Sequence, residues 1–81
     1  MGSPSRAARS LIGKRFTLTE PTLGILIDNY KCLAHRMARG TVVTVTEEPS
    51  RIDDEMVTVE AEGQEIAIFT ADLRFRGLAQ D

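Results

Sequence analysis

Two groupings of side chains in this sequence have the types that chemistry would need. Cys32 and His35 are the only cysteine and the only histidine, and they are three residues apart. On a helix this spacing puts a thiol and an imidazole on one face, as for a nucleophile and its base. On a strand the two side chains point to opposite faces. No third group that would orient the imidazole can be identified, so we favour a packed or surface histidine and assign no catalytic residue.

The second grouping is the acidic run Asp53-Asp54-Glu55. Carboxylates are the ligands that hard divalent cations prefer, but consecutive carboxylates rarely converge on one ion, and the spacing of an EF-hand is missing. Cys32 and His35 alone cannot supply the four ligands of a structural zinc. We therefore expect a solvated loop here, and neither a metal nor another cofactor.

Charge is divided unevenly along the chain. Residues 1–40 contain seven Lys and Arg against two Asp and Glu, and residues 41–81 contain three against ten, which gives +5 and −7. The basic half would suit phosphates, but RNA-binding barrels also expose aromatic side chains for base stacking. Three of the four aromatic residues occupy core-like strand positions. Nucleic-acid binding therefore stays a minority alternative, and pairing of the two halves within one fold is favoured.

Arginine and tyrosine are common anchors of recognition surfaces. The candidate ligand-binding residues are Tyr30, Arg36, Arg74 and Arg76. For each arginine, an ion pair with Glu60, Glu62 or Glu65 is the competing interpretation.

The first half of the chain predicts a basic tail over residues 1–10 and a strand over Arg15–Thr19. Leu23–Ile27 is apolar on both faces, which indicates a central strand or one covered by a partner. Residues 28–40 permit two structures. Asp28 as an N-cap and Gly40 as a C-cap fit a helix, whereas a turn at Asp28-Asn29 fits a hairpin with a returning strand. We favour the hairpin.

The second half predicts strands more clearly. Residues 56–62 and 64–69 alternate around the tight turn Glu62-Gly63. This turn would place Val59 opposite Ile66, with Val57 and Ile68 on the same core face. The opposite face contains Met56, Ala67 and Phe69. This face is too apolar to be fully exposed to solvent, so these three are the predicted interface residues. Thr70–Leu73 predicts one 3₁₀ turn, residues 73–76 a last strand, and residues 78–81 a C-terminal tail.

This order of elements resembles an SH3-like barrel. More narrowly, the chain resembles a group of short, uncharacterised bacterial proteins, through Gly13-Lys14-Arg15, Gly40–Val43, Met56–Val59, Gly63 and Ile66–Leu73. The resemblance implies a mainly β protein, a small five- to six-stranded SH3-like barrel over residues 11–77. Its motifs are structural, so it transfers no functional residue.

The chain is also similar in architecture to type II dihydrofolate reductases, which are short SH3-like barrels encoded on mobile gene cassettes. That similarity is compatible with a cassette origin here. The pore-lining stretch of those tetramers would fall on residues 65–68, which contain none of its Gln and Tyr groups. Reductase activity is therefore not expected.

The composition and length of the chain lead to an expected location, assembly and function. With one cysteine, no secretory signal and no apolar run of membrane length, we expect a cytoplasmic protein. Eighty-one residues bury little surface, so a homo-oligomer is expected. We predict a non-enzymatic β-barrel that binds and assembles as an oligomer with a protein or small-ligand partner. The alternatives are an enzyme whose site forms between subunits and a nucleic-acid binder.

Overall fold

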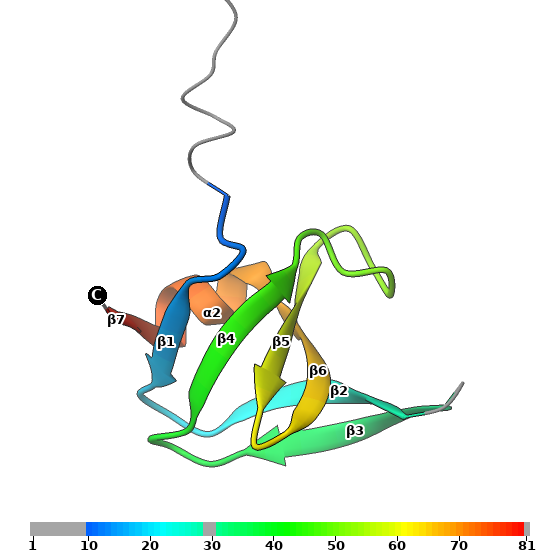
Figure 1. Ribbon diagram of the computed structural model, residues 1–81. Helices are drawn as coiled ribbons and strands as arrows, with labels where there is room; N and C mark the ends of the chain where they lie inside the picture. The colour runs from blue at the N-terminus through cyan, green and yellow to red at the C-terminus, as the bar shows by residue number, and fades with distance from the viewer. Residues whose placement is uncertain (1–9, 29–30, 81) are drawn as a thin grey trace, which may run out of the picture.

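The protein folds into one antiparallel sheet with a short helix (Figure 1), as seen in a computed structural model that describes residues 10–28 and 31–80. In chain order the elements are β1 (Arg15–Leu18), β2 (Thr22–Asp28), β3 (Lys31–Met37), β4 (Val42–Glu47), β5 (Met56–Ala61), β6 (Gln64–Phe69), α2 (Thr70–Arg76) and β7 (Gly77–Gln80). The predicted mainly β class is confirmed, with seven strands in place of the predicted five or six.

The strands are ordered β3-β2-β6-β5-β4-β1-β7 across the sheet. Within the described residues β3 pairs only with β2 and β7 only with β1, so the sheet is open and these two strands are its edges. Figure 1 shows β2 and β3 crossing below the other strands and extending beyond them.

The core lies on one face of the sheet, because apolar side chains alternate along each strand. Phe16 and Leu18 of β1 pack there with Val43 and Val45 of β4, and the buried Leu73 of α2 covers the cluster. The remaining fully or nearly buried members of this cluster are Met37, Val57, Val59, Ala61, Ile66 and Ile68. The core face predicted for the β5–β6 hairpin is therefore confirmed.

The β5–β6 hairpin has the predicted register, with Val59 opposite Ile66 and Val57 opposite Ile68. Both residues of its turn have a positive φ, 54° at Glu62 and 78° at Gly63. Two consecutive positive φ angles are what a two-residue type I′ turn requires, and they match the twist of the strands. Glycine adopts this conformation readily, whereas glutamate does so at a cost.

The β2–β3 hairpin decides between the two structures that residues 28–40 permit. Thr22 pairs with Met37 and, seven pairs in all, the ladder continues without a shift to Asp28 and Lys31. The hairpin prediction is confirmed, and the helix is wrong. Gly24 allows β2 to lie close to β6, because a Cβ at this position would stand 2.6 Å from Cγ2 of Ile66 and 2.9 Å from the carbonyl oxygen of Ala67.

The loop between β4 and β5 folds back over the outer face of the β5–β6 hairpin. The amide of Ser50 donates to the carbonyl of Met56 over 2.8 Å, and the buried hydroxyl of Thr58 is hydrogen-bonded to the Ser50 hydroxyl at 2.9 Å. Arg51 reaches across to the Glu65 carboxylate at 3.0 Å. This loop is therefore part of the fold, and not only a solvated connection.

The end of the chain differs from its prediction. Thr70–Arg76 is a seven-residue helix rather than a 3₁₀ turn followed by a strand. The alternation of Leu73 and Phe75 suggested a strand, but only Leu73 is buried, and Phe75 is 87% exposed. Asp72 in the first turn and Arg74 and Arg76 in the last turn stabilise the helix, because their charges are opposite to the partial charges at its two ends. Residues 77–80, predicted mostly as tail, form β7 against β1.

Candidate functional site

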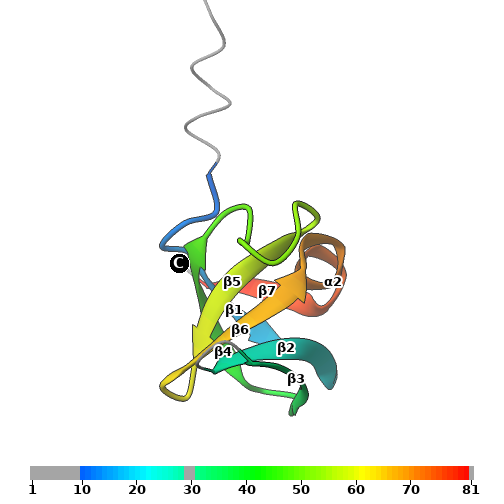
Figure 2. The ribbon, with the colours of Figure 1, turned by 90° about the vertical axis from the view of Figure 1, so that its right-hand side faces the viewer.

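One exposed edge of the sheet is formed by the β2–β3 hairpin, which Figure 2 shows at one end of the molecule, on the side away from the chain's first described residues. β3 is an edge strand, and five of its seven residues are exposed. An edge strand presents unpaired backbone N–H and C=O groups to any chain that approaches it. This edge can therefore accept a further strand.

The outer face of this hairpin is largely apolar. The register places Leu23, Ile25 and Ile27 of β2 on the same face as Cys32, Ala34 and Arg36 of β3. We call these six residues the hairpin face, and Arg36 is its one charged member. Leu23 is 61% exposed, Ile25 and Ile27 are half-buried, and Cys32 and Ala34 are exposed. Of the two interpretations of Leu23–Ile27, a central strand or a strand covered by a partner, the central strand is confirmed, since β2 lies between β3 and β6. Leu23 on its outer face is nevertheless exposed to solvent.

Cys32 and His35 do not form a catalytic pair. Both lie on β3, where Cys32 is opposite Ile27 and His35 is opposite Gly24. Residues three apart on a strand point to opposite faces. The thiol therefore lies on the hairpin face and the imidazole on the other side of the sheet, so the structure excludes the helical nucleophile–base arrangement.

The structure describes three of the four predicted ligand-binding residues, since Tyr30 lies outside the described residues. Arg36 is exposed on β3 opposite Leu23, and Arg74 is exposed on α2. Arg76 has a structural contact, because its guanidinium donates to the carbonyl of Pro21 over 3.0 Å. The three arginines therefore come from two different elements, β3 and α2, and none of them lines the loop pocket described below.

The predicted ion pairs of these arginines with Glu60, Glu62 and Glu65 are absent from residues 10–28 and 31–80. Arg51 forms the salt bridges instead, to Glu47 and to Glu65, each at 3.0 Å. Sequence reasoning missed Arg51. The sequence did contain a signal for this ion pair, because Arg51 follows Glu47 by four residues. That spacing brings two side chains together on a helix, and here it does so in a loop that folds back on itself.

Glu47 is the centre of this cluster. Its carboxylate accepts hydrogen bonds from the Thr58 hydroxyl at 3.0 Å, from the Arg51 amide at 3.3 Å and from Nη1 of Arg51 at 3.0 Å. The Thr58 hydrogen bond, followed by the contacts with Arg51, holds the pKa of Glu47 below its ordinary value. The cluster ties the β4–β5 loop to the sheet.

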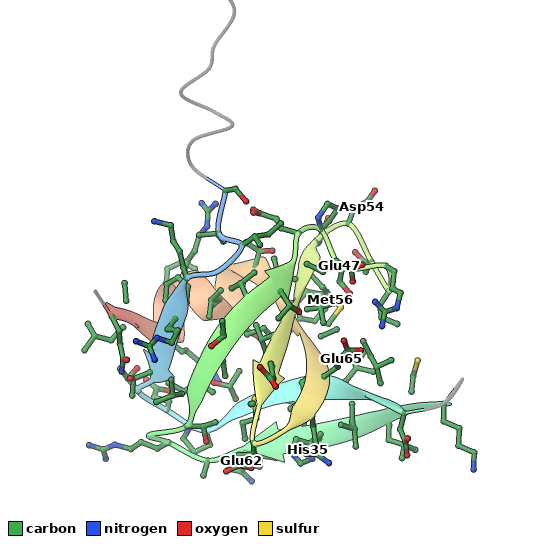
Figure 3. All side chains as sticks on the ribbon, in the orientation of Figure 1. His35, Glu47, Asp54, Met56, Glu62 and Glu65 are labelled. Atoms are coloured by element: carbon green, nitrogen blue, oxygen red, sulfur yellow. The ribbon has the colours of Figure 1, made fainter. Side chains whose placement is uncertain are left out.

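A second surface feature lies where this loop meets the start of α2. It is a cavity of about 560 Å³, which we call the loop pocket. Figure 3 shows Asp54 and Met56 at this end of the molecule, with His35 and Glu62 at the opposite end. The lining residues are Glu48, Pro49, Asp54, Glu55, Met56, Phe69, Thr70 and Ala71.

The three residues of the acidic run Asp53-Asp54-Glu55 have different roles at the loop pocket. Oδ1 of Asp53 accepts a hydrogen bond of 2.8 Å from the Glu55 amide, and the Asp53 carbonyl accepts one of 3.1 Å from the Met56 amide. Asp53 therefore shapes the loop, while Asp54 and Glu55 line the pocket. No group of three or more metal-ligating side chains occurs in the part of the chain that the structure describes.

The three predicted interface residues have different environments. Met56 is 3% exposed and Ala67 is fully buried within the chain, on the face that the β4–β5 loop overlies. Phe69 is 46% exposed and lines the loop pocket. Of the three, only Phe69 presents much surface that a partner can contact in this conformation.

Comparison with protein-family models, with curated proteins and with solved structures finds no match to this chain. No helix within the described residues is long and apolar enough to cross a membrane. The functional argument therefore depends on the geometry of the hairpin face, the β3 edge and the loop pocket.

Proposed function

We propose that this chain is a non-enzymatic assembly module that forms a homodimer through the β3 edge. In the dimer, the β3 strands of two copies pair in antiparallel fashion and join the two sheets. A two-fold axis is the commonest symmetry of protein dimers, and an edge strand pairs readily with its own copy.

The observation that carries the proposal is the exposure of β3. Its ladder with β2 extends over seven residues without a bulge, and the strand contains no proline. A bulge or a proline would discourage pairing with a further strand, so β3 lacks both of these protections. Lys31 and Arg36 flank an uncharged central stretch of Cys32, Leu33 and Ala34. The charges of Lys31 and Arg36 restrict the registers in which a second strand can pair, but the uncharged middle of β3 remains free to pair.

The charges favour one register. With the two-fold axis at Ala34, all seven residues find partners, with Lys31 opposite Met37 and Arg36 opposite Cys32 of the second copy. No two like charges are then directly opposed, which would be unfavourable. An axis at Leu33 would oppose Lys31 to His35 and leave residues unpaired. We therefore propose the Ala34-centred register.

The proposal includes the SH3-like barrel class and a cytoplasmic location. The β1–β7 pairing, the consecutive pairing of β4, β5 and β6, and the single helix before the last strand support a curved SH3-like arrangement. The one described cysteine is exposed and free, which fits a reducing compartment.

The test is sedimentation velocity over a range of concentrations, with and without Ala34→Glu. The parent chain is expected to sediment as a dimer at high concentration. Because Ala34 is exposed, the substitution should leave the fold intact while placing two like charges at the axis. We expect it to weaken dimerisation at least about tenfold.

The matched control is Leu78→Glu, which places the same charge on β7, the other edge of the sheet, at a residue that is 64% exposed. It should sediment like the parent. A parent chain that stays monomeric at every concentration contradicts the proposal. Dimers lost with Leu78→Glu but kept with Ala34→Glu would place the contact on β7 and contradict it as well.

A further inference from the structure

We propose that the loop pocket binds an arginine side chain from a peptide segment of a partner protein. This inference goes beyond the dimer, because the pocket is built by the β4–β5 loop and the β6–α2 junction, and no residue of β3 lines it. It assigns to the chain a second binding surface with its own chemistry.

The apolar wall of the pocket fits the flat body of a guanidinium group. Phe69 is half exposed there, beside Met56, Pro49 and Ala71. A guanidinium stacks favourably on the face of an aromatic ring, and the alkyl part of an arginine packs against apolar side chains. The cavity of about 560 Å³ has room for a side chain of this size.

The charge of the pocket selects a cation. Its lining includes the carboxylates of Glu48, Asp54 and Glu55 and no Lys, Arg or His. Oε1 of Glu48 is engaged with the backbone amide of Leu11 at 2.7 Å. Asp54 and Glu55 have no salt bridge with any residue that the structure describes. These two carboxylates are therefore the expected partners of the guanidinium, which binds carboxylates through paired hydrogen bonds.

The pocket is held by hydrogen bonds on both sides. The Thr70 amide donates to the Glu55 carbonyl over 2.9 Å, which joins the start of α2 to the loop. The Ser50 amide donates to the Met56 carbonyl, and the Met56 amide to the Asp53 carbonyl. A site already shaped in this way loses less entropy when a ligand binds.

A neighbouring residue explains why the ligand should be a peptide rather than a free amine. Ile25 pairs with Ala67, and the alternation along each strand puts Leu23 and Phe69, each two residues from this pair, on the same face of the sheet. Leu23 is one of the most exposed apolar residues of the sheet. An apolar residue next to the arginine would contact Leu23 while the guanidinium occupies the pocket.

The experiment is a titration of the full chain with acetyl-Leu-Arg-Leu-amide, followed by NMR chemical shifts. We expect saturable shifts at the loop pocket and affinity that weakens with added salt. The same peptide with citrulline in place of arginine keeps the shape and loses the charge, and it should bind at least about tenfold more weakly. Free acetyl-arginine-amide should also bind more weakly than the tripeptide.

Variants locate the site. Asp54→Asn combined with Glu55→Gln should weaken tripeptide binding at least about tenfold, and Phe69→Leu should weaken it while keeping an apolar wall. Glu60→Gln removes an exposed carboxylate of β5 that does not line the pocket, and should bind like the parent. Repeating the titration with Ala34→Glu separates this result from the dimer, since the two surfaces share no residue.

Three outcomes overturn the inference. The first is the absence of saturable shifts at peptide concentrations up to about 5 mM, and the second is equal binding of the citrulline peptide. The third is much tighter binding by a variant with Arg6→Ala and Arg9→Ala, which would mean that the chain's own N-terminal segment is the occupant.

Discussion

Glu62 has a left-handed backbone conformation that glutamate rarely adopts. It has a φ of 54° in the β5–β6 turn, a region that asparagine and glycine enter more easily than glutamate. Its position next to Gly63 makes the preferred sequence of this turn Asn-Gly. We predict that Glu62→Asn raises the free energy of unfolding by about 0.5 to 1 kcal/mol, measured by chemical denaturation.

The control for this substitution is Glu60→Asn. Glu60 is also exposed and acidic, but it lies within β5, opposite Glu65. Asparagine is unfavourable within a strand, but the substitution also removes the like charge opposite Glu65, so this variant should differ little in stability from the parent. Equal stabilisation by both variants would mean that the lost negative charge is the cause, and not the turn.

Buried residues on the outer face of β5 and β6 show what residue patterns miss. The sequence identified Met56, Ala67 and Phe69 as too apolar for solvent, and Met56 and Ala67 are indeed buried. Their cover is the chain's own β4–β5 loop, held through Ser50, Thr58 and Arg51. Alternation within a strand indicates which face is apolar, but it does not say which distant segment covers that face.

At the scale of elements, the attachment of the β4–β5 loop should depend on pH. The pKa of Glu47 is lowered in the folded state, so its carboxylate stabilises the fold at pH values above the unfolded pKa. This contribution is lost as the pH falls through the lower folded value. Unfolding measured from neutral to acidic pH should show the parent losing stability over this range.

Glu47→Gln tests the cause. The variant should be less stable than the parent at neutral pH, and the difference between the two should shrink as the pH falls. Arg51→Gln is the partner control and should show a smaller change of the same sign, because Thr58 still donates to Glu47. A stability difference between parent and Glu47→Gln that is the same at all pH values would contradict this account.

The elements differed in how well they could be predicted. The β5–β6 hairpin followed from its Gly turn and strict alternation. Local propensity in residues 28–40 favoured a helix, and the β2–β3 hairpin was preferred only on topology and on the resemblance to an SH3-like barrel. The end of the chain did not, because Leu73-Arg-Phe-Arg76 alternates like a strand while its charges suit a helix end. The loop pocket was not predicted, since its walls come from segments more than ten residues apart.

At the scale of the whole molecule, the charge asymmetry of the sequence is reflected in two surfaces. The β3 edge contains Lys31 and Arg36 and no acidic residue, whereas the loop pocket has three carboxylates and no cation. Each surface also has an exposed apolar side chain, Leu33 on β3 and Phe69 at the loop pocket. The proposed dimer uses the first surface and the proposed arginine site uses the second.

The most direct test of the proposed assembly is a cysteine cross-linking scan of β3. In a Cys32→Ser background, Leu33→Cys, Ala34→Cys and His35→Cys are oxidised one at a time, with Leu78→Cys on β7 as the control. Residues directly opposed across an antiparallel pair have Cα atoms about 4.5 to 5.5 Å apart, within the range of a disulfide. We predict that Ala34→Cys gives covalent dimers fastest. Absence of cross-links at all three β3 positions, or faster cross-linking at Leu78→Cys, would contradict assembly through this edge.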